Sequence, residues 1–330
     1  MMVRWMALLH LCLMSQFGIS QVINKPLVVA SASMIADMAK NIGGEYVKVE
    51  MIVTVGGDPH LHEPTPEDAR LVSSADLILI NGLTFEGWIN KLIENSGTSA
   101  KTEIVTKGIS VLDNKDYKNS VDPHAWMDAS NGVIYANNIK NALVQLDPDH
   151  QEAYEKNYNR YVTLLNALHQ RIKDDINTIP KERRVLITSH DAFQYYGRAY
   201  GIQLEAIMGI STEAEAQTSD IIRVNQIIRA HNIPAIFIES TINPKLIQQI
   251  AHDNKINIGG KLYADSLGDK DSPASSYIDM LTYNTRTIVD ALRTPSSAST
   301  IDKPENPSKL WILGAIMLAG FALIIYRRNG

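Results

Sequence analysis

Three histidines and one aspartate lie in four short segments whose composition suits a shared metal ion. His60 lies in Asp-Pro-His-Leu-His-Glu-Pro (58–64), His124 in Asp-Pro-His-Ala-Trp (122–126), His190 in Thr-Ser-His-Asp-Ala-Phe (188–193) and Asp265 in Tyr-Ala-Asp-Ser (263–266). Three imidazoles and one carboxylate make a complete ligand set for a transition metal. Because a closed set leaves no open coordination position, it favours a protein that holds a metal ion over one that uses it in catalysis.

His60 and His124 share the local sequence Asp-Pro-His. The proline fixes the backbone just before the histidine, and the aspartate can cap the turn or accept a hydrogen bond from the ligand. Either histidine alone could equally be structural. Two copies of one phrase favour a metal-binding role for both.

His190 and Asp265 each follow an apolar, strand-like run. In open α/β sheets, ligands bind beyond the carboxyl ends of the strands. The structural alternative for His190 is a helix N-cap, although Ser189 or Asp191 would serve that purpose better. For Asp265 the alternative is an Asx-turn.

His62 forms a His-x-His pair with His60, as in some metallohydrolases. Such enzymes usually supply more histidine or aspartate nearby, and here the nearest candidate, Asp68, lies beyond two prolines. We therefore predict that His62 lies near the site without being a ligand. Four other histidines lie in polar, helix-like sequence and are expected to be solvated: His150, His169, His231 and His252.

The elements that must position these residues alternate between apolar strands and helices. Strands are expected at 26–31, 47–53, 77–81 and 103–105, and again at 184–189, 202–207, 235–240 and 260–264. Between these sets, one apolar stripe predicts a helix of roughly 30 residues, ended by Pro180. The pattern predicts an α/β fold of two lobes with mostly parallel sheets, joined by one long rigid backbone helix, with the metal site in the interlobe cleft.

The two ends of the chain resemble targeting segments. A signal peptide is expected at 1–20, and 310–326 is an apolar run that would cross a membrane and keep Arg327 and Arg328 in the cytoplasm. Leu11 before Cys12 disfavours lipidation of that cysteine. The expected division is 1–20 signal peptide, 25–147 N-terminal lobe, 148–180 linking helix, 181–293 C-terminal lobe, 294–309 flexible tether and 310–326 transmembrane helix.

Composition narrows the class of protein. The chain has 330 residues, a net charge of -5 and no basic cluster, which argues against a nucleic-acid partner. Cys12 is the only cysteine, and it falls in the expected signal peptide. The mature protein therefore has neither a disulfide nor a thiolate metal site.

The four segments together resemble the metal-binding solute-binding proteins of ABC transporters, in the zinc/manganese class (TroA/ZnuA-like, also called the adhesin-type lipoprotein family). The resemblance covers about residues 25–293 and extends to Ala-Asp-Leu-Ile (75–78) and Asn-Gly (81–82). It implies that a metal is buried between two lobes whose relative movement is small. It also implies ligand roles for four residues: His60, His124, His190 and Asp265.

Three features depart from the pattern of that family. Members often carry a lipid on an N-terminal cysteine, whereas this chain is expected to use its C-terminal helix. Zinc-specific members often have a His-rich loop, which residues 113–121 lack, and manganese-specific members often have Glu where His190 stands. Nitrogen donors favour Zn²⁺, so we expect Zn²⁺ first and Mn²⁺ next, with Fe²⁺ as a further candidate.

The expected function is that of an extracytoplasmic, high-affinity receptor, in the periplasm or at the cell surface, anchored to the cytoplasmic membrane. It would deliver the metal to an ABC permease and its ATPase, and would have no catalytic residue and no enzymatic activity. One alternative is a surface adhesin. The other is a metallohydrolase, which would need an open coordination position and a general base, and the sequence contains no His-Glu-x-x-His motif.

Overall fold

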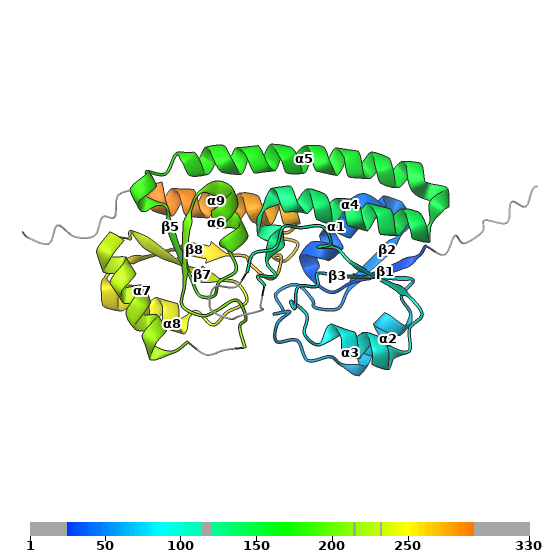
Figure 1. The fold of residues 1–330 in the computed structure, drawn as a ribbon, viewed down its shortest axis with the longest axis horizontal. Helices are drawn as coiled ribbons and strands as arrows, with labels where there is room; N and C mark the ends of the chain where they lie inside the picture. Colours follow the sequence, from blue (N-terminus) through cyan, green and yellow to red (C-terminus); the bar gives the residue numbers. More distant parts are fainter. Residues whose placement is uncertain (1–24, 114–120, 214–215, 232, 294–330) are drawn as a thin grey trace, which may run out of the picture.

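The described part of the chain forms two α/β lobes beneath one long helix (Figure 1). The computed structural model describes residues 25–113, 121–213, 216–231 and 233–293. In Figure 1 the N-terminal lobe lies on the right and the C-terminal lobe on the left, while α5 (Gln151–Asn177) runs above both. The predicted two-lobed α/β architecture is confirmed.

The N-terminal lobe contains a parallel sheet with the strand order β2-β1-β3-β4. Its strands are β1 (Leu27–Ala30), β2 (Lys48–Met51), β3 (Leu77–Ile80) and β4 (Lys101–Ile104). Alternate residues of β1 and β3 face two separate apolar clusters. One cluster includes α1 (Ser33–Gly43) and α4 (Ala129–Leu146), and the other includes α2 (Pro66–Ser73) and α3 (Ile89–Ser96). Helices on both faces explain why β3 is apolar throughout.

The C-terminal lobe contains two pairs of parallel strands. They are β5 (Val185–Thr188) with β6 (Gln203–Ala206), and β7 (Ala235–Glu239) with β8 (Asn257–Leu262). The helices of this lobe are α6 (Gln194–Tyr200), α7 (Thr218–His231), α8 (Lys245–Asn254) and α9 (Tyr277–Arg293). Because all the strand pairs in both lobes of the described chain are parallel, the prediction of mostly parallel sheets is confirmed.

Helix α5 packs against both lobes along its length. Its 27 residues span about 40 Å at the usual rise per residue. Its buried side chains lie on one stripe: Tyr154, Tyr161, Leu165, Leu168, Ile172 and Ile176. This stripe belongs to the same apolar cluster as residues of α1 and α4 in one lobe and α9 in the other. The helix therefore braces both lobes from one side.

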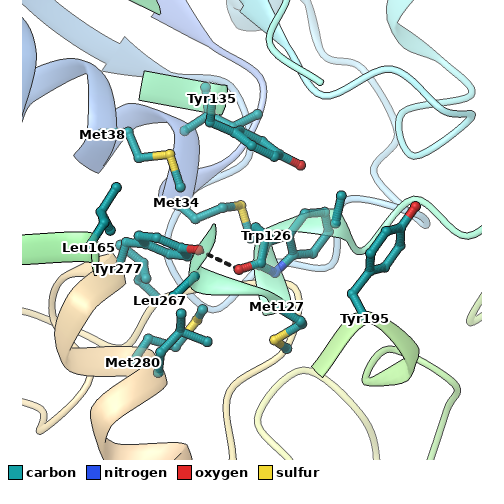
Figure 2. Close-up of a cluster of buried hydrophobic side chains, with 14 of the residues drawn as sticks. Met34, Met38, Trp126, Met127, Tyr135, Leu165, Tyr195, Leu267, Tyr277 and Met280 are labelled. Carbon is teal, nitrogen blue, oxygen red and sulfur yellow. Dashed lines mark hydrogen bonds between the residues drawn. The ribbon is translucent and has the colours of Figure 1, made fainter. Parts of the chain in front are cut away.

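A buried cluster also joins the lobes beneath α5, and Figure 2 shows it around Trp126 and Tyr277. The Tyr277 hydroxyl donates a hydrogen bond to the backbone oxygen of Trp126 at 2.5 Å. The backbone N–H of Tyr277 donates to Asp37 Oδ2 at 3.0 Å, which ties the start of α9 to α1. The junction between the lobes is thus a packed core with specific polar links.

Three predicted segments lie outside the residues that the structure describes: the signal peptide at 1–20, the tether at 294–309 and the transmembrane helix at 310–326. Of the helices within the described ranges, none combines the length and the apolar character that crossing a bilayer requires.

Candidate metal centre

The four predicted side chains meet between the lobes. His60 lies in the loop between β2 and α2, and His124 directly precedes the short helical turn Ala125–Met127. His190 follows β5 and Asp265 follows β8. One nitrogen or oxygen atom from each residue lies within 4.8 Å of the others, and all four residues are buried. The structure therefore brings together every residue of the predicted set.

Asp265 lies between imidazoles from both lobes. Its Oδ2 is 3.1 Å from His190 Nε2 and 3.9 Å from His60 Nε2. Its Oδ1 is 3.4 Å from His124 Nε2. The Nε2 atoms of His60 and His124 are 3.3 Å apart. All three rings thus direct Nε2 toward one carboxylate.

Several atoms at this centre are buried without a hydrogen bond. They include both carboxylate oxygens of Asp265, both ring nitrogens of His190 and Oε2 of Glu239. Leaving such atoms unpaired costs free energy, so native structures usually give them a partner. Three imidazole nitrogens and one carboxylate around a common point are a donor set that fits a divalent transition metal.

Carboxylates behind two of the histidines hold them in place. Asp122 Oδ1 accepts a hydrogen bond from the backbone N–H of His124 at 2.9 Å and lies 2.7 Å from its Nδ1. Glu239 Oε1 accepts from the backbone N–H of His190 at 2.8 Å, while Glu239 Oε2 lies 2.6 Å from Nδ1. In both histidines, a carboxylate oxygen lies beside Nδ1 and Nε2 faces the centre.

His60 is held differently. Asp58 Oδ1 accepts a hydrogen bond from its backbone N–H at 2.9 Å, and its ring meets Phe85 edge-on with centroids 4.9 Å apart. Asp58 Oδ2 accepts a hydrogen bond from the Thr212 hydroxyl of the other lobe at 2.8 Å. The loop that carries His60 is therefore linked to the other lobe through Asp58.

Burial and neighbouring charges separate the protonation behaviour of the three histidines. Burial lowers the pKa of His60 to about 3. Burial also opposes a charge on His124, but the hydrogen bond and charge of Asp122, together with Asp265, raise its pKa to about 9. Despite burial, Glu239 and Asp265 raise the pKa of His190 well above its usual range. A metal ion must therefore displace protons from His124 and His190.

Asp265 remains ionised in this environment. Burial alone would raise its pKa, but the neighbouring imidazoles of His190 and His124 hold the pKa well below its usual range. A carboxylate that is ionised and buried between imidazoles is ready to accept a cation without first losing a proton.

His62 lies outside the group of four. Its Nε2 is 3.1 Å from Asp68 Oδ2, and its ring is 4.7 Å from that of Trp88. Three of the four histidines expected to be solvated have carboxylate partners. His150 Nδ1 lies 2.7 Å from Asp147, three residues earlier, and the exposed His252 lies 3.2 Å from the adjacent Asp253. His169 Nδ1 lies 3.4 Å from Asp128, because the packing of α5 against α4 brings these two residues together.

The contact of Glu239 with His190 was not predicted from the sequence. The available signal was an acidic residue at the end of an otherwise apolar strand, Ala-Ile-Phe-Ile-Glu (235–239). Glu239 is 3 % exposed. A carboxylate buried this deeply needs a polar partner, and that partner is His190.

Comparisons with known proteins find relatives over most of the chain. Residues 28–291 match the family described as "ZnuA: Zinc-uptake complex component A periplasmic". The chain is 36% identical over 277 residues to the metal ABC transporter substrate-binding lipoprotein SsaB of Streptococcus sanguinis, covering 82% of this chain and 90% of that protein. It is 37% identical over 273 residues to the manganese ABC transporter substrate-binding lipoprotein PsaA of Streptococcus mitis, covering 80% and 88%.

The fold also matches a solved structure, the periplasmic zinc binding protein TroA from Treponema pallidum. The TM-score is 0.78 at 34% sequence identity, and the match covers 82% of this chain and 100% of TroA. The resemblance inferred from the four segments is confirmed at the level of the family.

Proposed function

Since this chain belongs to the ZnuA family of metal-uptake receptors, we propose that it captures a divalent transition metal outside the cytoplasmic membrane and delivers it to an ABC permease and its ATPase. The family consists of substrate-binding proteins of ABC transporters, which are not enzymes. The metallohydrolase alternative is therefore wrong.

The proposed ligands are His60, His124, His190 and Asp265. One observation carries this assignment: their donor atoms converge within 4.8 Å in a buried position. The unpaired oxygens of Asp265 support it, because a bound cation would supply the partner that the protein does not. The metal is the cargo of this site, and no step of catalysis is assigned to it.

Zinc is the proposed first choice, with Mn²⁺ next and Fe²⁺ a further candidate. Three neutral nitrogen donors and one carboxylate suit Zn²⁺, which lies above Mn²⁺ in intrinsic affinity for such sites. The relatives differ on this point, since PsaA is named for manganese and TroA for zinc. We propose zinc because three of the four donor atoms are nitrogen.

The proposed location is extracytoplasmic. A signal peptide at 1–20 would export the two lobes, 25–147 and 181–293, with the helix at 148–180 between them. A tether at 294–309 and a helix at 310–326 would then hold the protein beside its permease and raise its local concentration there. Removing 294–330 tests this arrangement, because it should move the protein from the membrane fraction to the soluble fraction. A truncated protein that stays with the membrane would contradict the C-terminal anchor.

Deleting the gene in the organism that encodes it tests the function. Growth under chelation of zinc should fail, and the wild-type gene should restore both growth and cellular zinc. A gene carrying His124→Ala should make a folded protein that restores neither. Restoration by the His124→Ala gene would contradict uptake through this site and would agree with an adhesive role, which does not need the metal.

A further inference from the structure

Glu239 contacts His190 through both of its carboxylate oxygens. The side chains of both residues are fully buried. Oε1 binds the backbone N–H of His190 at 2.8 Å, and Oε2 lies 2.6 Å from ring Nδ1. One side chain at the end of β7 therefore fixes both the backbone and the ring of a residue at the end of β5.

The same double contact occurs in the other lobe. Asp122 Oδ1 contacts both the backbone N–H and ring Nδ1 of His124 at 2.9 and 2.7 Å. There the carboxylate lies two residues before the histidine, whereas Glu239 is 49 residues from His190 in sequence. Two unrelated local sequences thus arrive at one arrangement, which indicates that the arrangement serves the site.

The contact determines which ring nitrogen of His190 is available. A carboxylate beside Nδ1 favours a proton on that nitrogen, so Nε2 is the nitrogen that gives up its proton and offers its lone pair to a metal. Nε2 lies 3.1 Å from Asp265 Oδ2, on the side where the four donor atoms converge. Without Glu239, the ring could adopt the other tautomer or turn away from the centre.

We propose that Glu239 is a positioning residue for metal capture, which orients His190 so that Nε2 faces the metal. The inference rests on the proposed function of the site and extends it to a residue outside the donor set. It assigns Glu239 no direct contact with the metal, because none of its atoms belongs to the group of four.

Glu239→Gln tests the inference in the full-length protein. Glutamine keeps the size of the side chain and one oxygen, but its amide group favours an unprotonated Nδ1 and hence a proton on Nε2. The affinity for Zn²⁺, measured against a chromophoric chelator after stripping, should fall by about 10- to 100-fold. Glu182→Gln is the matched control, since Glu182 is exposed at the opposite end of β5, and its affinity should equal that of the wild type.

Two further measurements separate positioning from a loss of structure. The visible absorption of the protein with one equivalent of Co²⁺ should change in Glu239→Gln, because the ligand field changes when His190 is misplaced. Glu239→Asp keeps the charge on a shorter side chain, and its affinity should lie between those of the wild type and Glu239→Gln. If Glu239→Gln fails to fold, the Glu239→Asp affinity and Co²⁺ spectrum decide alone.

Wild-type affinity and an unchanged Co²⁺ spectrum in the folded Glu239 variants would overturn the inference. That outcome would leave the proposed function intact, since the wild type would still bind Zn²⁺. Failure of the wild type to bind Zn²⁺ would instead overturn the proposed function together with the inference that rests on it.

Discussion

The indole nitrogen of Trp126 donates a hydrogen bond to the backbone oxygen of Ala264 at 3.0 Å, and both residues are fully buried. Trp126 lies two residues after His124, and Ala264 directly precedes Asp265. A single bond across the lobes therefore links the segments that carry two of the proposed ligands. We therefore expect metal binding to depend on this contact between the lobes.

Trp126→Phe removes that bond while keeping most of the aromatic ring. A neutral hydrogen bond contributes about 1 kcal/mol, so the affinity for zinc should fall about fivefold. The loss should appear as faster dissociation of Zn²⁺. Stopped-flow release of Zn²⁺ to a chelator measures this rate. Tyr158→Phe, on the partly exposed side of α5, should leave the rate unchanged. Equal rates for the wild type and Trp126→Phe would show that the bond does not restrain the site.

Zinc binding should release protons. The pKa values of His124, at about 9, and of His190, well above its usual range, mean that both are protonated at pH 7 without metal. About two protons should therefore leave per Zn²⁺ bound, and affinity should fall steadily as pH decreases from about 9. Calorimetry in buffers of different ionisation enthalpy counts these protons. Binding without proton release would contradict the charge state described for the centre.

The metal-free protein should lose stability as the pH rises. The folded pKa of His124, about 9, exceeds the ordinary value of 6.5. The contribution of protonated His124 to the free energy of unfolding is therefore fully present below about pH 6.5 and is lost as the pH rises through about 9. Thermal unfolding of the stripped protein should show a falling Tm over this window. In His124→Gln the slope should be smaller, and an unchanged slope would assign the effect to another group.

The lobes should move little when metal binds. Helix α5 packs on both lobes, and Tyr277 links α9 to Trp126 and Asp37. X-ray scattering should therefore give the same radius of gyration for the stripped and the zinc-loaded protein. A clear decrease on loading would reveal a hinge that the packed junction does not predict.

Much of the fold follows from local sequence. The strands are short apolar runs, and the stripe of Tyr154, Tyr161 and Leu165 identifies α5, because these signals depend only on periodicity. The observed boundaries of the strands differ from the predicted boundaries by a few residues. The last strand begins at Asn257 rather than at 260, where a polar residue and two glycines obscure the pattern and a register shift interrupts the pairing with β7.

The four proposed ligands were predictable because each lies in a distinctive segment beside a strand or a turn. Glu239 was not, because its partner lies on another strand and nothing in the sequence pairs residues 190 and 239. The hydrogen bond between Asp58 and Thr212 was likewise not predictable, since it forms only when the two lobes come together. Local patterns identify donors, whereas contacts made by folding decide how those donors are held.

An equilibrium titration of the stripped protein measures directly whether the four proposed ligands hold a metal ion. Zn²⁺ and Mn²⁺ are added in competition with a chelator to the wild type and to His124→Ala. We expect one tightly held Zn²⁺ per chain that Mn²⁺ does not displace, and a loss of that binding in His124→Ala. Absence of tight one-to-one binding, or equal binding by His124→Ala, would show that these four residues do not form a metal site.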